Sequence, residues 1–565
     1  MTGFRMSFHW LSGQGSESDA RDVLRVRRLT IGFCILAILL GAMEAWRFRY
    51  SMNPDGVQYL DNAAAYVSGD FHQAINSQWS PLYPWLIGAM FSAFQPNPYL
   101  EFPLVHLLNF VIYLLSLAGF LFFLNGVLRR ISPQKRACVV LIAFSSFLYC
   151  SLDFTTLAYV TPDVLVSFFA FLAAGILLRM SAGTAAISGY LALGVVLGLG
   201  YLAKAPFLFF GLLCLGMALI LGGKQPAAWI RCGVTAALFA AIAVPYIWTL
   251  SNAKKRFTYG DSGRWNVIWM VNHVPYYHWQ GGPAGNGQPI HPTRQLSSNP
   301  AVFEFAAPVG GTYPPWYDPI YWTEGARIAF RPADFARALQ VQIQLYGYLV
   351  HRQLALVFAL AALLLLAPDK RLVFAGILKF WPVVLFGATP FAMYAMVHAD
   401  GRFFPAFFVM LWTALAAGIL LGLGDSLDAR MPFCIVTVAA ALMLVEALKV
   451  TFRTVPARLN YEVAQRTQAM GLKRGDPVAI VTGDFDYSWA RLAGARVILE
   501  VDFGKTSCPD CGQRQAEWAK AKPILGANGA VLVVSPCIAG VVDQPGWQQL
   551  GPTGVYAYRF TAPSR

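Results

Sequence analysis

The stretch LTIGFCILAILLGAMEAW, residues 29–46, decides the fold class of this chain. It is almost entirely apolar, and its length approaches the roughly 20 residues that a helix needs to cross the hydrocarbon core of a bilayer. Apolar runs of similar length recur along the chain, with short basic segments between them. This pattern is typical of helices that span a membrane.

The composition agrees with the first apolar run. Of the 565 residues, 57% are hydrophobic and 13% are charged, about half the charged share of an average soluble domain. A soluble globular enzyme is therefore excluded, and the runs predict an α-helical polytopic membrane protein with about eleven spans. The expected spans cover residues 29–46, 104–127, 137–151, 162–179, 185–202, 206–222, 228–250, 346–367, 372–396, 403–422 and 432–450.

The charge pattern predicts the orientation of these spans. The net charge is +14, and most of the excess lies in short loops, which indicates topology and not nucleic-acid binding. Residues 1–28 are then a cytoplasmic N-terminal segment. The basic residues expected on the cytoplasmic side are Arg25, Arg27, Arg28, Arg129, Arg130, Lys135, Arg136, Lys224, Arg231, Lys370 and Arg371. Three basic residues, Lys254 to Arg256, fall on the other side, in a long loop of the kind that is largely exempt from the positive-inside rule.

The long polar loops and the tail are expected to lie outside the cytoplasm. An odd number of spans places the loops 47–103, 251–345 and 397–402 there, together with the tail, residues 451–565. After the transmembrane domain, residues 29–450, the tail has short alternating runs that predict strands at 478–482, 496–501, 530–534 and 555–560. We expect it to form a small extracytoplasmic α/β domain. It carries no glycine-rich motif for nucleotide binding.

Metal and cofactor binding have no motif support. Cys508 and Cys511 form a C-x-x-C, for which a local disulfide or unpaired thiols are favoured over zinc, with Cys537 left over. Three histidines in the 251–345 loop have a spacing that fits no compact ligand set; they are His273, His278 and His291. We therefore expect no metal site and no cofactor; a divalent cation is left open as an alternative that no motif supports.

The first external loop is the most informative polar segment. It contains Asn53-Pro54-Asp55, and the spacing predicts a helix that Asp55 caps and that Ser68-Gly69 ends, followed by a second, membrane-skimming helix over 81–94. Asp55 and Asp61 are six positions apart, about 240° around a helix, so they do not form a glycosidase-like pair of carboxylates. Asp55 is either a plain helix cap or a functional carboxylate held at the membrane surface.

Four stretches of the membrane part resemble the GT-C superfamily of integral-membrane glycosyltransferases, in that family's order. The superfamily contains bacterial aminoarabinose transferases, protein O-mannosyltransferases and RgtA-type lipopolysaccharide sugar transferases. The resemblance covers about residues 25 to 450 and leaves out the tail and much of the 251–345 loop. The four stretches are the Asp55 loop with Ser80-Pro81-Leu82-Tyr83-Pro84, then Thr161-Pro162-Asp163, then Gly198 to Pro206, and finally His398-Ala399-Asp400-Gly401-Arg402-Phe403-Phe404-Pro405.

The resemblance implies a function. The donor would be a sugar on a polyprenyl phosphate, and the acceptor would be a lipid, a glycan or a protein at the external face of the inner membrane. An attacking hydroxyl needs a base, and the departing lipid phosphate needs cations. Asp55 matches the carboxylate that the family uses as base, and Asp163 would assist by orienting the acceptor or a basic side chain. For Asp163 a helix cap is the plain alternative.

Five further residues are expected to contact the substrate: Asp61, Lys204, Arg264, His398 and Arg402. Lys204 lies between two apolar segments, where it is either a donor-phosphate contact or a lysine that extends to the interface. Arg402 can pair with phosphate through two N–H groups. Family members often place an acidic residue directly before Arg-Tyr, whereas this chain has Asp400-Gly401-Arg402-Phe403, which leaves the role of Asp400 open.

The loop from Phe257 to Leu345 is rich in Trp, Tyr, Pro and Gly. Its aromatic side chains would either stack on sugars or rest at the membrane interface. Two other functions compete with the glycosyltransferase. A lipid or glycan transporter would need repeats in matching halves, which the sequence lacks. A catalytically inactive scaffold that binds polyprenyl lipid needs only the binding residues.

Overall fold

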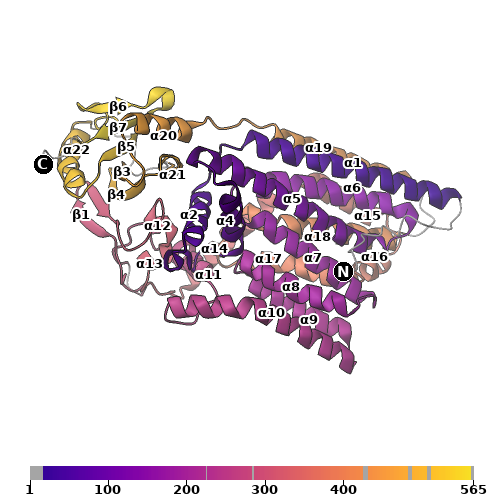
Figure 1. Ribbon diagram of the computed structural model, residues 1–565. Helices are drawn as coiled ribbons and strands as arrows, with labels where there is room; N and C mark the ends of the chain where they lie inside the picture. Colours follow the sequence, from indigo (N-terminus) through magenta and orange to yellow (C-terminus); the bar gives the residue numbers. More distant parts are fainter. Residues whose placement is uncertain are drawn as a thin grey trace.

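The computed structural model is an elongated helical bundle with a small sheet at one end (Figure 1). It describes residues 17–223, 225–282, 285–423, 430–481, 486–504 and 511–560. The chain is an integral membrane protein, and its helical polytopic fold with a C-terminal sheet is as predicted. The polar helices and the sheet lie together at one end of the bundle, and α16 lies at the opposite end (Figure 1).

Seven helices of the described chain are long and apolar enough to cross a membrane, counting α6 together with its π-helical end η2. They are α1 (Glu17–Arg47), α5 (Pro98–Leu128), α6 (Pro133–Tyr149) with η2 (Cys150–Thr155), α7 (Asp163–Ser181), α10 (Pro226–Ala253), α18 (Pro405–Gly422) and α19 (Arg430–Thr451). Two shorter apolar helices, α8 (Ile187–Ala203) and α9 (Phe207–Gly222), occupy the expected spans 185–202 and 206–222.

The remaining two expected spans are bent. α14 (Pro332–His351) and α15 (Leu354–Leu366) meet at 76°, and α16 (Lys370–Leu378) and α17 (Trp381–Tyr394) meet at 80°. The expected spans over 346–367 and 372–396 are therefore each interrupted by a bend that the apolar runs did not predict. For the second pair the reason is local, because Pro382 in the first turn of α17 favours a new helix start over continuation of α16.

Glycines allow some of the helices to pack with their backbones close together. A Cβ atom at Gly418 of α18 would lie 2.6 Å from Cα of Ile377 in α16, and one at Gly376 would lie 2.2 Å from the Gly418 carbonyl oxygen. Small residues are what membrane helices use for such close approach. The contact fixes α18, and with it the turn that precedes this helix.

The first external loop forms helices, as expected. They are α2 (Pro54–Ser68), α3 (Phe71–Ala74) and α4 (Leu82–Phe94). α2 ends at Gly69, which has the left-handed φ of 75° that glycine adopts most readily. Its N-cap is Asn53 and not Asp55, so the expected cap was wrong. The Asn53 side chain instead accepts a hydrogen bond of 2.8 Å from the Val160 amide, which ties the start of α2 to the segment before α7.

The described part of the chain contains one sheet of seven strands, in the order β1-β2-β4-β3-β5-β7-β6. Its central strands β3, β4 and β5 are parallel, and the outer pairs are antiparallel. The strands are β1 (Arg294–Ser298), β2 (Ala301–Glu304), β3 (Pro477–Val481), β4 (Arg496–Asp502), β5 (Leu532–Pro536), β6 (Trp547–Gln549) and β7 (Val555–Arg559). The four strands expected in the tail are present, but β1 and β2 come from the 251–345 loop, so the sheet extends beyond residues 451–565.

The tail also contacts the bundle directly. Its helices are α20 (Leu459–Ala469), α21 (Ser488–Ala493) and α22 (Cys511–Ala527), with a short turn η5 (Gly551–Thr553). Arg491 of α21 forms ion pairs with Glu101 of α5 at 2.8 Å and with Asp61 of α2 at 2.7 Å. Cys508 lies outside the described residues, so its pairing with Cys511 stays a prediction, and Cys537 is a free thiol.

Candidate active site

A cavity of about 670 Å³ opens where the polar helices meet the bundle. Its walls come from the first turn of α2, the segment before α4, the start of α7, the break between α8 and α9, and the turn before α18. The helix α11 (Ser262–Asn266) and the π-helical η3 (Val267–Val271) complete it. Six of the seven residues expected in the site line this cavity: Asp55, Asp163, Lys204, Arg264, His398 and Arg402.

Asp55 lies in the first turn of α2, where the helix dipole favours a negative charge. Its carboxylate bonds to two groups from distant segments. Oδ2 pairs with the Arg402 guanidinium at 2.9 Å, and Oδ1 accepts a hydrogen bond of 3.2 Å from the Trp316 indole. Both partners also line the cavity, and Asn53 is the N-cap of α2, so the Asp55 side chain belongs to the cavity wall and is not the cap of its helix.

Asp163 and Lys204 form a second ion pair at the bottom of the site. Asp163 is the first residue of α7, its side chain is 3% exposed, and its Oδ1 accepts from the Lys204 ammonium at 2.5 Å. Lys204 has an extended backbone in the break between α8 and α9, and its Nζ lies 3.8 Å from the centre of the Phe403 ring. Burial lowers the pKa of Lys204, and Asp163 opposes that shift. The ammonium group is therefore held inside the cavity.

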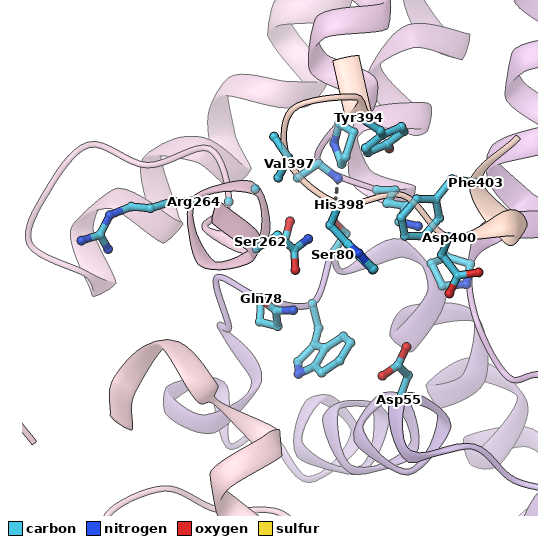
Figure 2. A pocket seen from close by; sticks show the side chains of 18 of the residues that line it. Asp55, Gln78, Ser80, Ser262, Arg264, Tyr394, Val397, His398, Asp400 and Phe403 are labelled. Atoms are coloured by element: carbon cyan, nitrogen blue, oxygen red, sulfur yellow. Dashed lines mark hydrogen bonds between the residues drawn. The ribbon is translucent and has the colours of Figure 1, made fainter. Parts of the chain in front are cut away.

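The turn before α18 supplies the second cation. Besides Asp55, Arg402 contacts Asp400 at 3.1 Å and Asp163 at 3.7 Å. Burial alone would lower the pKa of Arg402, but the three carboxylates outweigh burial and raise it. Asp400 also accepts a hydrogen bond of 3.2 Å from the Arg402 amide, which starts the 3₁₀ turn η4 (Gly401–Phe403). Figure 2 shows the side chains of Asp55 and Asp400 near each other, as expected for two carboxylates that contact the same guanidinium.

His398 and Arg264 have weaker positions in the site. His398 is half-buried beside Asp400, and burial lowers the pKa of its imidazole, although Asp400 acts in the opposite direction. Arg264 sits at the rim and donates to the Ala326 carbonyl at 2.5 Å. In Figure 2 its guanidinium points away from Asp55. A substrate contact by Arg264 would therefore need a different rotamer.

Asp61 lies outside the cavity, on the other side of α2. Its carboxylate is 4% exposed, pairs with Arg491, and accepts hydrogen bonds from the Thr312 amide at 2.7 Å and hydroxyl at 2.9 Å. The six-residue offset from Asp55 that excluded a same-face pair also directs Asp61 away from the site. Its contacts connect α2 to the tail.

Several residues that line the cavity were not singled out from the sequence, or were named only within a longer stretch. Trp79, Trp269 and Trp316 line the cavity beside Asp55, and the rings of Trp79 and Trp316 are 6.1 Å apart. Ser80 accepts a hydrogen bond of 3.0 Å from the Ala205 amide and so holds the α8–α9 break in place. The aromatic richness of the loops was the available signal, but it could not select these side chains from their neighbours.

Two of the three histidines with no compact spacing, His278 and His291, have separate partners. His278 lies 3.1 Å from Glu500 and stacks on Phe303, while His291 lies 3.4 Å from Glu324. Within the residues that the structure describes, no group of three or more His, Cys, Asp or Glu side chains could hold a metal ion.

Comparisons with known proteins gave similar structures but no similar sequences. No protein-family model matches the chain, and no curated protein matches it. ArnT from Cupriavidus metallidurans bound to undecaprenyl phosphate is 13% identical, with 93% of this chain and 97% of that chain covered and a TM-score of 0.44. The oligosaccharyltransferase AglB from Archaeoglobus fulgidus, in complex with an inhibitory peptide and a dolichol-phosphate, is 12% identical, with 90% and 69% covered and a TM-score of 0.45.

Proposed function

We propose that this chain is a glycosyltransferase that moves a sugar from a polyprenyl-phosphate donor to an acceptor at the external face of a bacterial inner membrane. One observation carries the proposal. The charged residues of all four family-like stretches meet in one cavity, where Asp55 pairs with Arg402 and Asp163 pairs with Lys204. A site with a carboxylate and two cations at the end of a span bundle suits an attacking hydroxyl and a departing lipid phosphate.

The geometry suggests how the groups divide the reaction. The acceptor oxygen bonds to the anomeric carbon, the bond from that carbon to the phosphate oxygen breaks, and the phosphate leaves with the electron pair. Arg402 and Lys204 bind the phosphate. Because Arg402 also holds Asp55, a phosphate that takes the guanidinium frees that carboxylate to accept the hydroxyl proton. Asp163 keeps Lys204 charged and in position despite its burial.

The aromatic side chains fit a sugar-binding role in this scheme. Trp79, Trp269 and Trp316 give the cavity apolar faces next to Asp55, and aromatic rings pack well on the faces of sugars. These residues do not identify the donor sugar, and they do not decide whether the acceptor is a lipid, a glycan or a protein. The transporter and scaffold alternatives share the cations but do not require Asp55.

The orientation is part of the proposal. The loops 47–103 and 251–345 and the tail lie at the same end of the bundle (Figure 1), which supports one common side for them. By the positive-inside rule that side is external and the N-terminus is cytoplasmic. A periplasm-specific phosphatase fused after residue 565 should be active, and a fusion active only with cytoplasmic reporters would reverse the sidedness of the site.

The donor site can be tested with the purified protein and a labelled sugar on undecaprenyl phosphate. Lys204→Met and Arg402→Gln should each weaken donor binding by about 10- to 150-fold, the worth of a charge-assisted hydrogen bond. Lys254→Met is the matched control, because Lys254 forms a similarly half-buried pair with Asp318 at 2.9 Å outside the cavity. Equal donor affinity in both variants would contradict the phosphate site.

The same preparation separates the three functions. A glycosyltransferase releases undecaprenyl phosphate when acceptor, or water in its place, is present. A transporter moves the intact donor across a vesicle membrane without release, and a scaffold binds the donor with neither outcome.

A further inference from the structure

A second cavity, of about 360 Å³, lies at the end of α1, where the tail enters the bundle. Its lining joins the last turn of α1 and the linker to α2 with the linker between α19 and α20. It is lined by Met43, Trp46, Arg47, Arg49, Tyr50, Ser51, Val455, Pro456 and Arg458. None of these residues takes part in the site around Asp55.

Three guanidinium groups meet in this cavity, which we call the arginine cleft. Arg458 and Arg49 lie on the Tyr50 ring, 3.8 Å and 4.5 Å from its centre. Arg47 donates to the Arg453 carbonyl at 2.9 Å, and its Nε is buried with no hydrogen-bond partner. None of the three forms an ion pair with a carboxylate among the described residues. The neighbouring Arg453, by contrast, is paired with the buried Glu44 at 3.2 Å.

Apolar side chains lead to the cleft from the bundle. On α1 the exposed residues follow a helical spacing that ends in the cleft: Ile31, Ile35, Leu39, Met43 and Trp46. The exposed apolar residues of α19 include Val438, Leu442, Val445 and Leu448, and the exposed Phe452 directly follows this helix. These two helices lie side by side (Figure 1). The surface is therefore apolar along the helices and strongly cationic at their end.

We propose that the arginine cleft binds the phosphate headgroup of an anionic phospholipid, with the acyl chains lying along α1 and α19. Guanidinium groups suit a phosphate because they offer paired N–H donors. Within the described part of the chain the three positive charges have no carboxylate counter-ion, and the apolar surface that leads to the cleft matches the acyl chains of the same lipid molecule. The bound headgroup would bridge the α1–α2 linker and the start of the tail.

The test uses the full-length protein in detergent, titrated with phosphatidylglycerol and followed by native mass spectrometry. Each basic residue near a membrane surface contributes about 1 kcal/mol to the attraction of anionic lipid. Arg49→Gln combined with Arg458→Gln should therefore raise the apparent Kd of the most tightly bound phosphatidylglycerol about 10- to 30-fold. Lys473→Gln combined with Arg474→Gln removes the same charge from exposed positions in the tail and should leave the Kd unchanged. Arg458→Gln alone changes an exposed side chain, so it tests the site if the double variant fails to fold.

Separate titrations identify the source of the phosphate. Phosphatidylcholine, glycerol 3-phosphate and inorganic phosphate should each bind at least tenfold more weakly than phosphatidylglycerol. Equally tight binding of either soluble phosphate would overturn the lipid assignment in favour of a free phosphate ester. Unchanged phosphatidylglycerol affinity in Arg458→Gln and in the double variant would overturn the cleft as a binding site.

Discussion

Asp55 and Arg402 are 347 positions apart in the sequence, yet their side chains meet at 2.9 Å. This contact changes the interpretation of Asp55. A residue that caps its own helix would direct its oxygen toward the first backbone N–H groups, whereas Asp55 directs both oxygens to Arg402 and Trp316. Asn53 takes the cap position. The carboxylate is thus held by the Arg402 and Trp316 side chains inside the cavity, where it can reach a bound hydroxyl group.

Asp55→Asn tests that role directly. The amide oxygen can still accept from the Trp316 indole, so the cavity should keep its shape, but the proton acceptor is lost. We expect turnover to fall by about 10² to 10⁴, the usual contribution of a positioned base, while donor binding is retained or becomes tighter because Arg402 loses a competing carboxylate. Asp70→Asn is the control, because Asp70 is an exposed cap of α3 and Asn caps comparably. Turnover of Asp55→Asn within a few-fold of the wild type would make Asp163 the next base candidate.

His398 predicts a pH dependence of stability. Burial lowers its pKa from the usual 6.5, so the unfolded chain binds the proton more strongly than the folded one. Above pH 6.5 the imidazole is neutral in both the folded and the unfolded chain, so His398 does not lower the free energy of unfolding there. As the pH falls below 6.5, the unfolded chain takes up the proton first, and the free energy of unfolding decreases. Thermal unfolding in detergent between pH 7.5 and 5.5 should show a smaller acid loss in His398→Asn than in the wild type. If both proteins lose the same stability at acid pH, the loss comes from groups other than His398. His72→Asn is the control, because His72 is an exposed side chain on α3.

At the scale of elements, the site depends on how α18 and the α8–α9 break are held. Arg402 precedes α18, which packs closely on α16 through Gly376 and Gly418. Lys204 occupies a break that Ser80 holds through the Ala205 amide. Both cations thus sit at helix ends whose positions are set by packing against other helices.

Gly418→Ala tests the α16–α18 contact. The added methyl group would lie 2.6 Å from Cα of Ile377, backbone that cannot move aside cheaply. We expect a loss of about 1–3 kcal/mol, as for other overpacked sites, seen as a lower unfolding temperature, and weaker donor binding because the turn with Arg402 shifts. Gly216→Ala in α9 meets no atom within 4 Å and should keep or raise the unfolding temperature. Equal behaviour of the two variants would contradict the tight contact.

For the whole molecule, the tail and the membrane domain are joined more closely than the motifs suggest. β2 from the 251–345 loop pairs with β4 of the tail, and Tyr487 accepts a hydrogen bond of 3.0 Å from Gln58 of α2. Arg491 neutralises two carboxylates, Asp61 and Glu101, at the same interface. The tail therefore helps to place the helix that carries Asp55.

Arg491→Gln should accordingly destabilise the protein by about 3–5 kcal/mol, because two buried carboxylates lose their partner. Arg466→Gln is the control, since Arg466 forms an exposed pair with Glu462 at 3.8 Å, worth about 0–1 kcal/mol. Thermal unfolding measures the stability of both variants.

A chain cut after Arg453 should aggregate or lose donor binding, because it lacks Arg491 and the other tail residues that contact α2. A truncated protein with wild-type stability and donor release would show that the tail is a separate unit.

The sequence alone was sufficient for the properties that depend on neighbouring residues. In the described part of the chain, the apolar runs predicted where the membrane helices lie but not the bends in two of them, and the alternating runs of the tail predicted β3, β4, β5 and β7, because hydrophobic periodicity is local. The stretches around Asp55, Asp163, Lys204 and Arg402 were selected by their resemblance to the GT-C superfamily, which short motifs in the sequence also carry. Only the tertiary structure decided which of these side chains meet. The pairing of Asp55 with Arg402, the diversion of Asp61 to the tail, and the addition of β1 and β2 to its sheet join segments up to hundreds of residues apart, and such contacts arise from packing that no short pattern encodes.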